Sequence, residues 1–263
     1  MPELNPLLRR LTASAPAMAL LALTIACGQQ IPEPPTGAVD ADRFLYDRGM
    51  EELEDGHWFQ AREYFQRLVD TYPRSENRPN AKIGIGDTYM GEGRVDSQIL
   101  AAAEYREFLQ FFPLHERADY AQYQLAQSYS RQMHSSARDQ SMSHDALREV
   151  ETFLRAHTTS PYRAEIEELE RAIRDRLAEA EFRVGLFYHR SENWVGCLLR
   201  FQHVLDEYPN YTRMDQVFFH IAETYRKVGA LDEAAPFYDR VLNEFPESEY
   251  ADDSTKRLAE IRR

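Results

Sequence analysis

Apolar residues recur at intervals of three and four along most of the chain, which is the period of an amphipathic helix. The clearest case is a single stripe between Tyr162 and Arg190, made of Ile166, Leu169, Ile173, Leu177, Ala180, Val184 and Phe187. Alternating patterns typical of β-strands are hard to find. We therefore predict an all-α fold, with one unusually long helix from Tyr162 to Arg190.

Similar phrases close several of the helical stretches. Each of LVDTYPRS (68–75), FLQFFPLH (108–115), VLDEYPNY (204–211) and VLNEFPES (241–248) ends a helical stretch with an aromatic residue followed by a proline. Proline blocks helix continuation and so forces a turn. The prolines stand 40, 48, 48 and 37 residues apart, at Pro73, Pro113, Pro161, Pro209 and Pro246. Periods in this range indicate stacked pairs of helices.

Each unit also has an internal spacing of small and aromatic residues. Ala222, Ala234, Tyr238 and Pro246 share it with two earlier sets, Gly185, Cys197, Phe201, Pro209 and Gly49, Ala61, Phe65, Pro73. Small residues let two helices cross closely, and the aromatic rings fill the space beside them. This pattern resembles the tetratricopeptide repeat (TPR). In that register Cys197 is a packed core thiol.

The resemblance implies a right-handed α-solenoid of about five TPR repeats with a C-terminal capping helix. The expected repeats are residues 41–73, 76–113, 116–161, 162–209 and 213–246, followed by a cap over 250–263, so that the solenoid spans 41–263. The third unit carries a polar insert around 132–141, which we expect to be an exposed loop.

The first 40 residues have the pattern of an export signal and a tether. Arg9 and Arg10 precede an uncharged run of 16 residues, 11–26, which is shorter than the roughly 18–20 needed to span a bilayer. Ala26 then precedes Cys27, as in a bacterial lipobox. That likeness implies cleavage of a signal peptide, residues 1–26, and a diacylglycerol on Cys27, with further acylation such as palmitate. The alternative is an ordinary signal cut elsewhere. Residues 27–40 are proline-rich and suit an extended tether.

Charge and motifs narrow the function. The net charge of −13 argues against nonspecific nucleic-acid binding, which relies on Lys and Arg. The eight histidines show no i,i+3 or i,i+4 pairing, and HExxH, CxxC and GxSxG are absent. GIGDTYMGEG (84–93) lacks the Lys-Ser/Thr of a phosphate loop. We expect no enzyme activity, no metal and no cofactor apart from the lipid on Cys27.

A binding surface is the remaining candidate site. In similar repeat proteins the first helix of each unit lines a groove, and projecting that register gives two rows of residues. The first row is Tyr46, Ile83, Tyr123, Phe182 and Phe219, and the second, one turn on, is Met50, Asp87, Gln127, Leu186 and Glu223. Aromatic residues supply binding energy with little rotamer entropy to lose. The alternative is that several of these aromatic rings are buried between helices.

The whole combination resembles the BamD family of outer-membrane assembly lipoproteins. LEDGHWFQAREYFQRLVDTYP (53–73) and RDRLAEAEFRVGLFYHRSENW (174–194) carry the resemblance. It implies a lipid-anchored protein on the periplasmic face of the outer membrane. The implied partners are a BamA-like barrel-inserting protein, bound through a periplasmic POTRA domain, and unfolded outer-membrane proteins. The alternatives are a Tol–Pal-associated coordinator of cell division and cell-wall synthesis, or a lipoprotein of another envelope complex.

The lipid anchor can be tested directly. If Cys27 carries the lipid, Cys27→Ala releases the protein into the soluble periplasmic fraction or leaves it unprocessed, because the thiol is the attachment atom. Membrane fractionation with an antibody against the solenoid measures this. Unchanged membrane association of the variant would contradict the tether.

Overall fold

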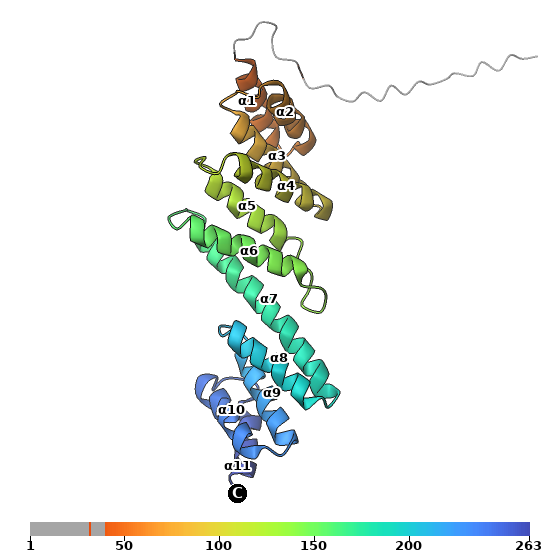
Figure 1. Cartoon of the computed structure of the whole chain (residues 1–263), viewed down its shortest axis with the longest axis vertical. Helices are drawn as coiled ribbons and strands as arrows, with labels where there is room; N and C mark the ends of the chain where they lie inside the picture. Colours follow the sequence, from red (N-terminus) through yellow and green to blue (C-terminus); the bar gives the residue numbers. More distant parts are fainter. Residues whose placement is uncertain (1–31, 33–39) are drawn as a thin grey trace, which may run out of the picture. The chain divides into compact units, whose positions relative to one another are not determined.

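The computed structural model describes residue 32 and residues 40–263, so the predicted signal peptide, Cys27 and most of the tether lie outside the described residues. Within the described part the chain forms eleven α-helices and no strand (Figure 1). The helices are α1 (Ala41–Glu54), α2 (Trp58–Thr71), α3 (Arg78–Glu92), α4 (Val95–Phe111), α5 (Ala118–Ser130), α6 (Ser141–Ala156), α7 (Arg163–Arg190), α8 (Trp194–Glu207), α9 (Met214–Lys227), α10 (Leu231–Glu244) and α11 (Ala251–Ile261).

Each helix packs mainly on its neighbours in the chain. The helices therefore form five successive pairs, from α1 with α2 to α9 with α10, and α11 packs against α10. Ser254 and Leu258 of α11 are buried there, beside the core of the last pair. This arrangement confirms the all-α, TPR-type solenoid with a terminal helix that the spacing predicts.

The second helix of each pair ends as the aromatic–proline phrases predict. At Tyr72, Phe112, Tyr208 and Phe245 the backbone leaves the helical region, with φ near −130°, and proline follows directly. The third pair differs. α6 ends at Ala156, and His157 stands at the position of the aromatic residue. The residue after it is Thr158, where the other pairs have proline. Pro161 lies four residues after His157, in the connection to α7, so it does not directly follow the end of this helix.

In the first, second and fourth pairs an aromatic ring of one helix sits on a glycine of the other, which holds the two helices at close distance. Gly49, Gly86 and Gly185 face the rings of Phe65, Tyr105 and Phe201, and a Cβ atom at any of the three would lie 2.6 Å or less from the ring. Ala126 and Ala222 occupy the same position in the third and fifth pairs, and both are fully buried. The small-residue register predicted for the repeats is therefore the register of the packed core.

A repeated hydrogen bond fixes the connection between successive pairs. The Ser160 hydroxyl donates to Asp119 Oδ2 at 2.7 Å, which ties the loop after α6 to the first turn of α5. Ser75 with Asp42, and Ser248 with Asp215, make the same bond in the first and fifth pairs. Each serine oxygen also accepts from the backbone N–H two residues on, at 3.1–3.2 Å. The serine side chain thus joins the loop to the first helix of the same repeat and to the start of the next helix.

α7 is the longest of the described helices. It runs unbroken for 28 residues, and Figure 1 shows α6 beside its first half and α8 beside its second half. The predicted insert is the loop between α5 and α6, and it reaches the middle of α7, where Arg176 Nη1 donates to the carbonyl of His134 at 2.6 Å. The predicted long helix from Tyr162 to Arg190 is confirmed.

The glycine contacts give a stability prediction. Gly185→Ala should lower the free energy of unfolding by about 1–3 kcal/mol, because the added methyl overlaps the buried Phe201 ring and this outweighs the better helix propensity of alanine. Urea unfolding measures the change. The double variant Gly185→Ala/Phe201→Leu should lose less free energy of unfolding than the sum of the losses in the two single variants, because the smaller leucine side chain removes the overlap. Strictly additive losses would show that the ring is not what the methyl meets.

Candidate protein-binding site on the first helices of the repeats

The structure divides the ten predicted groove residues between surface and core. Ile83 and Phe182 are 0 % and 1 % exposed, so they are core residues and the prediction that they line an open groove is wrong. Ile83 packs in the cluster around Phe108 and Leu125, and Phe182 lies 5.4 Å from the Phe201 ring. The other eight are partly exposed: Tyr46, Met50, Asp87, Tyr123, Gln127, Leu186, Phe219 and Glu223.

Asp87 of α3 is the centre of a cluster in the N-terminal repeats. Its Oδ1 accepts hydrogen bonds from the hydroxyls of Tyr105 at 2.6 Å and Tyr120 at 2.9 Å. Arg117 Nη2 lies 3.9 Å from Oδ2, and its guanidinium stacks over the Tyr120 ring. Burial raises the pKa of Asp87, although these hydrogen bonds and the charge of Arg117 act against it. The same burial and the Asp87 charge raise the pKa of Tyr120.

This cluster continues along α5 into the start of α7. The Tyr123 ring stacks on Tyr162 with 4.8 Å between centroids, and Tyr162 also lies 5.7 Å from Tyr120. Gln127 Nε2 donates to the Tyr123 hydroxyl at 3.3 Å. Burial is the main cause of the raised pKa of Tyr46 in α1. The charge of Arg117 lowers this pKa and the charge of Asp87 raises it. These residues offer aromatic rings, hydroxyl groups and one guanidinium, groups suited to an extended peptide.

A second cluster lies in the C-terminal repeats, around Glu223 of α9. Glu223 accepts hydrogen bonds from Arg226, Tyr238 and Arg257. Burial acts to raise the pKa of Glu223, but the bonds from Arg226 and Tyr238 and the two positive charges outweigh it, so that the pKa is lowered. Phe219, one turn earlier, stacks on Tyr250 at 4.6 Å. Predicted residues Phe219 and Glu223 therefore belong to one surface.

His220 stands beside this cluster in an aromatic environment. Its ring centroid lies 5.6 Å from those of Phe182 and Phe219, 6.0 Å from Tyr250 and 5.8 Å from His189. Desolvation lowers the pKa of His220 to about 4, and the nearby His189 adds to this while Glu223 acts against it. The imidazole is therefore neutral in the folded protein at neutral pH.

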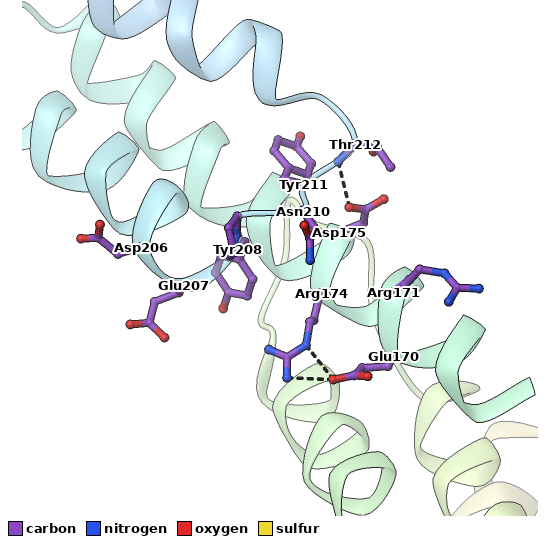
Figure 2. Close-up of a pocket in the computed structure, with 11 residues that line it drawn as sticks. Glu170, Arg171, Arg174, Asp175, Asp206, Glu207, Tyr208, Asn210, Tyr211 and Thr212 are labelled. Carbon is purple, nitrogen blue, oxygen red and sulfur yellow. Dashed lines mark hydrogen bonds and ion pairs between the residues drawn. The ribbon is translucent and has the colours of Figure 1, made fainter. Parts of the chain in front are cut away.

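One hollow on the surface lies apart from both clusters. It has a volume of about 550 Å³ and is formed where the loop between α8 and α9 crosses the middle of α7 (Figure 2). The backbone N–H of Thr212 donates to Asp175 Oδ1 at 3.1 Å, and Arg174 pairs with Glu170 at 2.9 Å. Tyr211 donates to Glu179, and burial together with this bond raises the pKa of Tyr211. The bonds from Thr212 and Tyr211 hold the loop on α7, and none of the predicted groove residues lines the hollow.

Across residues 40–263, His, Cys, Asp and Glu side chains form no group of three or more placed to bind a metal ion. Among the helices that the structure describes, none combines the length and apolar character needed to cross a membrane.

Sequence reasoning missed several residues of the clusters. Arg117, Tyr162 and Tyr250 directly precede α5, α7 and α11, outside the helical positions that a register projects. The phrases SPY (160–162) and SEY (248–250) carried a usable signal, because each places a tyrosine two residues after the junction serine.

The environment of His220 predicts a pH dependence of stability. Because its pKa is about 4 when folded and about 6.5 when unfolded, the unfolded state takes up the proton first as the pH falls. Stability from this residue is complete above pH 6.5 and should drop by about 2 kcal/mol at pH 5. Urea unfolding at pH 7.5 and 5 measures it. His220→Phe should remove that part of the loss and His144→Phe, at an exposed site, should not. An equal loss in all three proteins would contradict the assignment.

Comparison with known proteins identifies the family. A family model described as an outer membrane lipoprotein, YfiO, matches residues 39–238. The outer membrane protein assembly factor BamD of Caulobacter vibrioides is 25% identical over 191 residues, covering 72% of this chain and 61% of that protein. The factor of the same name in Vibrio cholerae is 24% identical over 204 residues, covering 72% of this chain and 81% of that protein.

Among solved structures, the chain is similar to one described as the TPR2AB-domain:pHSP90 complex of yeast Sti1. It is 11% identical, covers 84% of this chain and 83% of its own, and has a TM-score of 0.48. The family match rests on the sequence and runs from just before α1 to the middle of α10. The chain therefore belongs to the YfiO family of outer membrane lipoproteins.

Proposed function

We propose that this chain is a scaffold of the machinery that inserts β-barrel proteins into the outer membrane. The family match over residues 39–238 is the observation that carries the proposal. The printed names of the relatives, outer membrane protein assembly factors, agree with it. The chain spans 61% of the Caulobacter relative and 66% of a Xylella fastidiosa relative, so the complete activity of those proteins is itself part of the proposal.

The proposed anchoring is a lipid on Cys27, which holds the solenoid at the periplasmic face of the outer membrane. A tether raises the effective concentration of two partners that meet at the same membrane. The mechanism is binding alone, with no catalytic step and no cofactor. Two partners are proposed: a BamA-like barrel-inserting protein, through its POTRA domain, and unfolded outer-membrane proteins.

The two clusters differ in a way that favours a different partner at each end of the solenoid. The Asp87 cluster presents tyrosine rings, hydroxyls and Arg117, which suit the alternating side chains and the carboxylates of an extended unfolded chain. At the Glu223 cluster three donors already satisfy the carboxylate, which makes a preformed and rigid surface. Such a surface suits a folded domain, because little order is lost on binding. We assign the first to unfolded substrates and the second to the barrel-inserting partner.

The test is co-purification of the tagged full-length protein from its own membranes in mild detergent, with partners identified by mass. A large barrel protein that carries periplasmic repeat domains should be recovered. The matched control is residues 1–40 fused to an unrelated domain, which keeps the signal, Cys27 and tether and should recover none. Recovery of Tol–Pal or cell-wall synthesis proteins in place of the barrel protein would overturn the function and leave the fold intact.

A further inference from the structure

α7 is longer than the helix that covers its first half. α6 has 16 residues and α7 has 28, which correspond to about 24 and 42 Å. The two are antiparallel neighbours, since Arg163 Nη1 reaches the carbonyl of Leu154 near the end of α6. The loop that precedes α6 meets α7 at Arg176. α6 and the loop before it therefore cover their side of α7 only as far as the middle of the helix.

The apolar stripe of α7 does not end there. Its first part is buried, with Ile166, Ile173 and Leu177 at most 2 % exposed. The same stripe then continues at three- and four-residue steps through Ala180 to Val184 and Phe187, which are 38 % and 63 % exposed. One face of one helix is thus half covered and half open, and the open half keeps the spacing of a face that packs against a helix.

An arginine row borders the open half. Arg176, Arg183 and Arg190 are spaced by seven residues, which places them on one edge of the stripe. Arg183 is 53 % exposed, and the one ion pair that it makes with another described residue, Glu179, is long at 4.0 Å. Glu179 is also held by Tyr211 and Arg213. On the other edge the carboxylate of Glu181 is paired with Arg200 at 2.9 Å. Within a chain of net charge −13, this edge carries uncompensated positive charge.

The other side of the same segment is rigidly held. Ala178, Phe182 and Gly185 are buried on the face opposite the open stripe. Gly185 is in direct contact with the Phe201 ring of α8. The open stripe is therefore presented on a fixed backbone, and a partner that docks on it does not have to order the helix first.

We propose that the segment of α7 from Ala180 to Arg190 binds an acidic amphipathic α-helix of another protein. The partner helix would lie along the second half of α7, which α6 does not cover. Its apolar face would contact Val184 and Phe187, and its acidic edge would run along Arg183 and Arg190. Two features favour a helix with this charge: the open stripe continues a seam that a helix already covers, and its border is basic. This site is separate from the Asp87 and Glu223 clusters and does not depend on the proposed function.

Binding can be measured with defined peptides and the full chain purified in mild detergent. The probe is a fluorescent 18-residue helical peptide with leucines at i, i+3, i+4 and i+7 and glutamates on both flanks. Its counterpart has lysine in place of every glutamate. By fluorescence anisotropy the glutamate peptide should bind at least tenfold more tightly, and its affinity should fall between 50 and 500 mM salt because surface charges are screened.

Two variants locate the site. Val184→Glu/Phe187→Glu should weaken the glutamate peptide at least tenfold, whereas Phe111→Glu, at an equally exposed (62 %) phenylalanine of α4, should not. Arg183→Glu/Arg190→Glu should reverse the preference toward the lysine peptide. It changes only exposed side chains, so it keeps the test decisive if the first variant fails to fold by circular dichroism.

Three results would overturn the proposal. One is equal affinity for the two peptides, and another is unchanged affinity in a folded Val184→Glu/Phe187→Glu protein. The third is a concentration-dependent dimer, seen by sedimentation, that this variant abolishes, because the stripe would then be the contact between two copies. Failure of the co-purification above would leave these peptide results unaffected, so the two proposals fail separately.

Discussion

Close approach of an aromatic ring to a glycine or alanine is the contact on which this solenoid depends. At Gly49, Gly86 and Gly185 the ring occupies the space where a Cβ atom would stand. This contact sets the distance between the two helices of a pair and also their register, because a shift by one residue would place a larger side chain under the ring. Since each helix packs mainly on its neighbours in the chain, the fold is built up from a series of such local contacts.

The sequence contains most of this information because the contacts are local. The spacing from small residue to aromatic residue to proline predicts the helix pairs, and the stripe from Ile166 to Phe187 predicts α7. The serine–aspartate bonds at the junctions could not be read in the same way. They join residues 33 or 41 positions apart, one of them in a loop, and no helical period connects them. His157 in place of an aromatic–proline pair shows that similar geometry can arise without the motif.

The binding surface was less predictable than the fold for a related reason. A fixed offset along the first helices finds positions of equal orientation, but it does not tell how far the next helix covers each one. Ile83 is enclosed by residues of α4 and α5, whereas Tyr123 at the same offset remains partly exposed beside Tyr162. Arg117 and Tyr250 enter the clusters from loops, where helical projection has no meaning.

The continuity of α7 has a consequence for local unfolding. In a repeat protein each unit contacts only its neighbours, so one unit can open while the next stays closed. Here the backbone hydrogen-bond ladder runs unbroken from the α6 pairing to the α8 pairing. Because one continuous helix packs on α6 of the third repeat and on α8 of its own repeat, unfolding that starts at either end of α7 meets no loop at which to stop, and we expect the two repeats to open together. In hydrogen exchange, amides from both halves of α7 should therefore show similar free energies of opening, as part of a foldon that also includes α6 and α8.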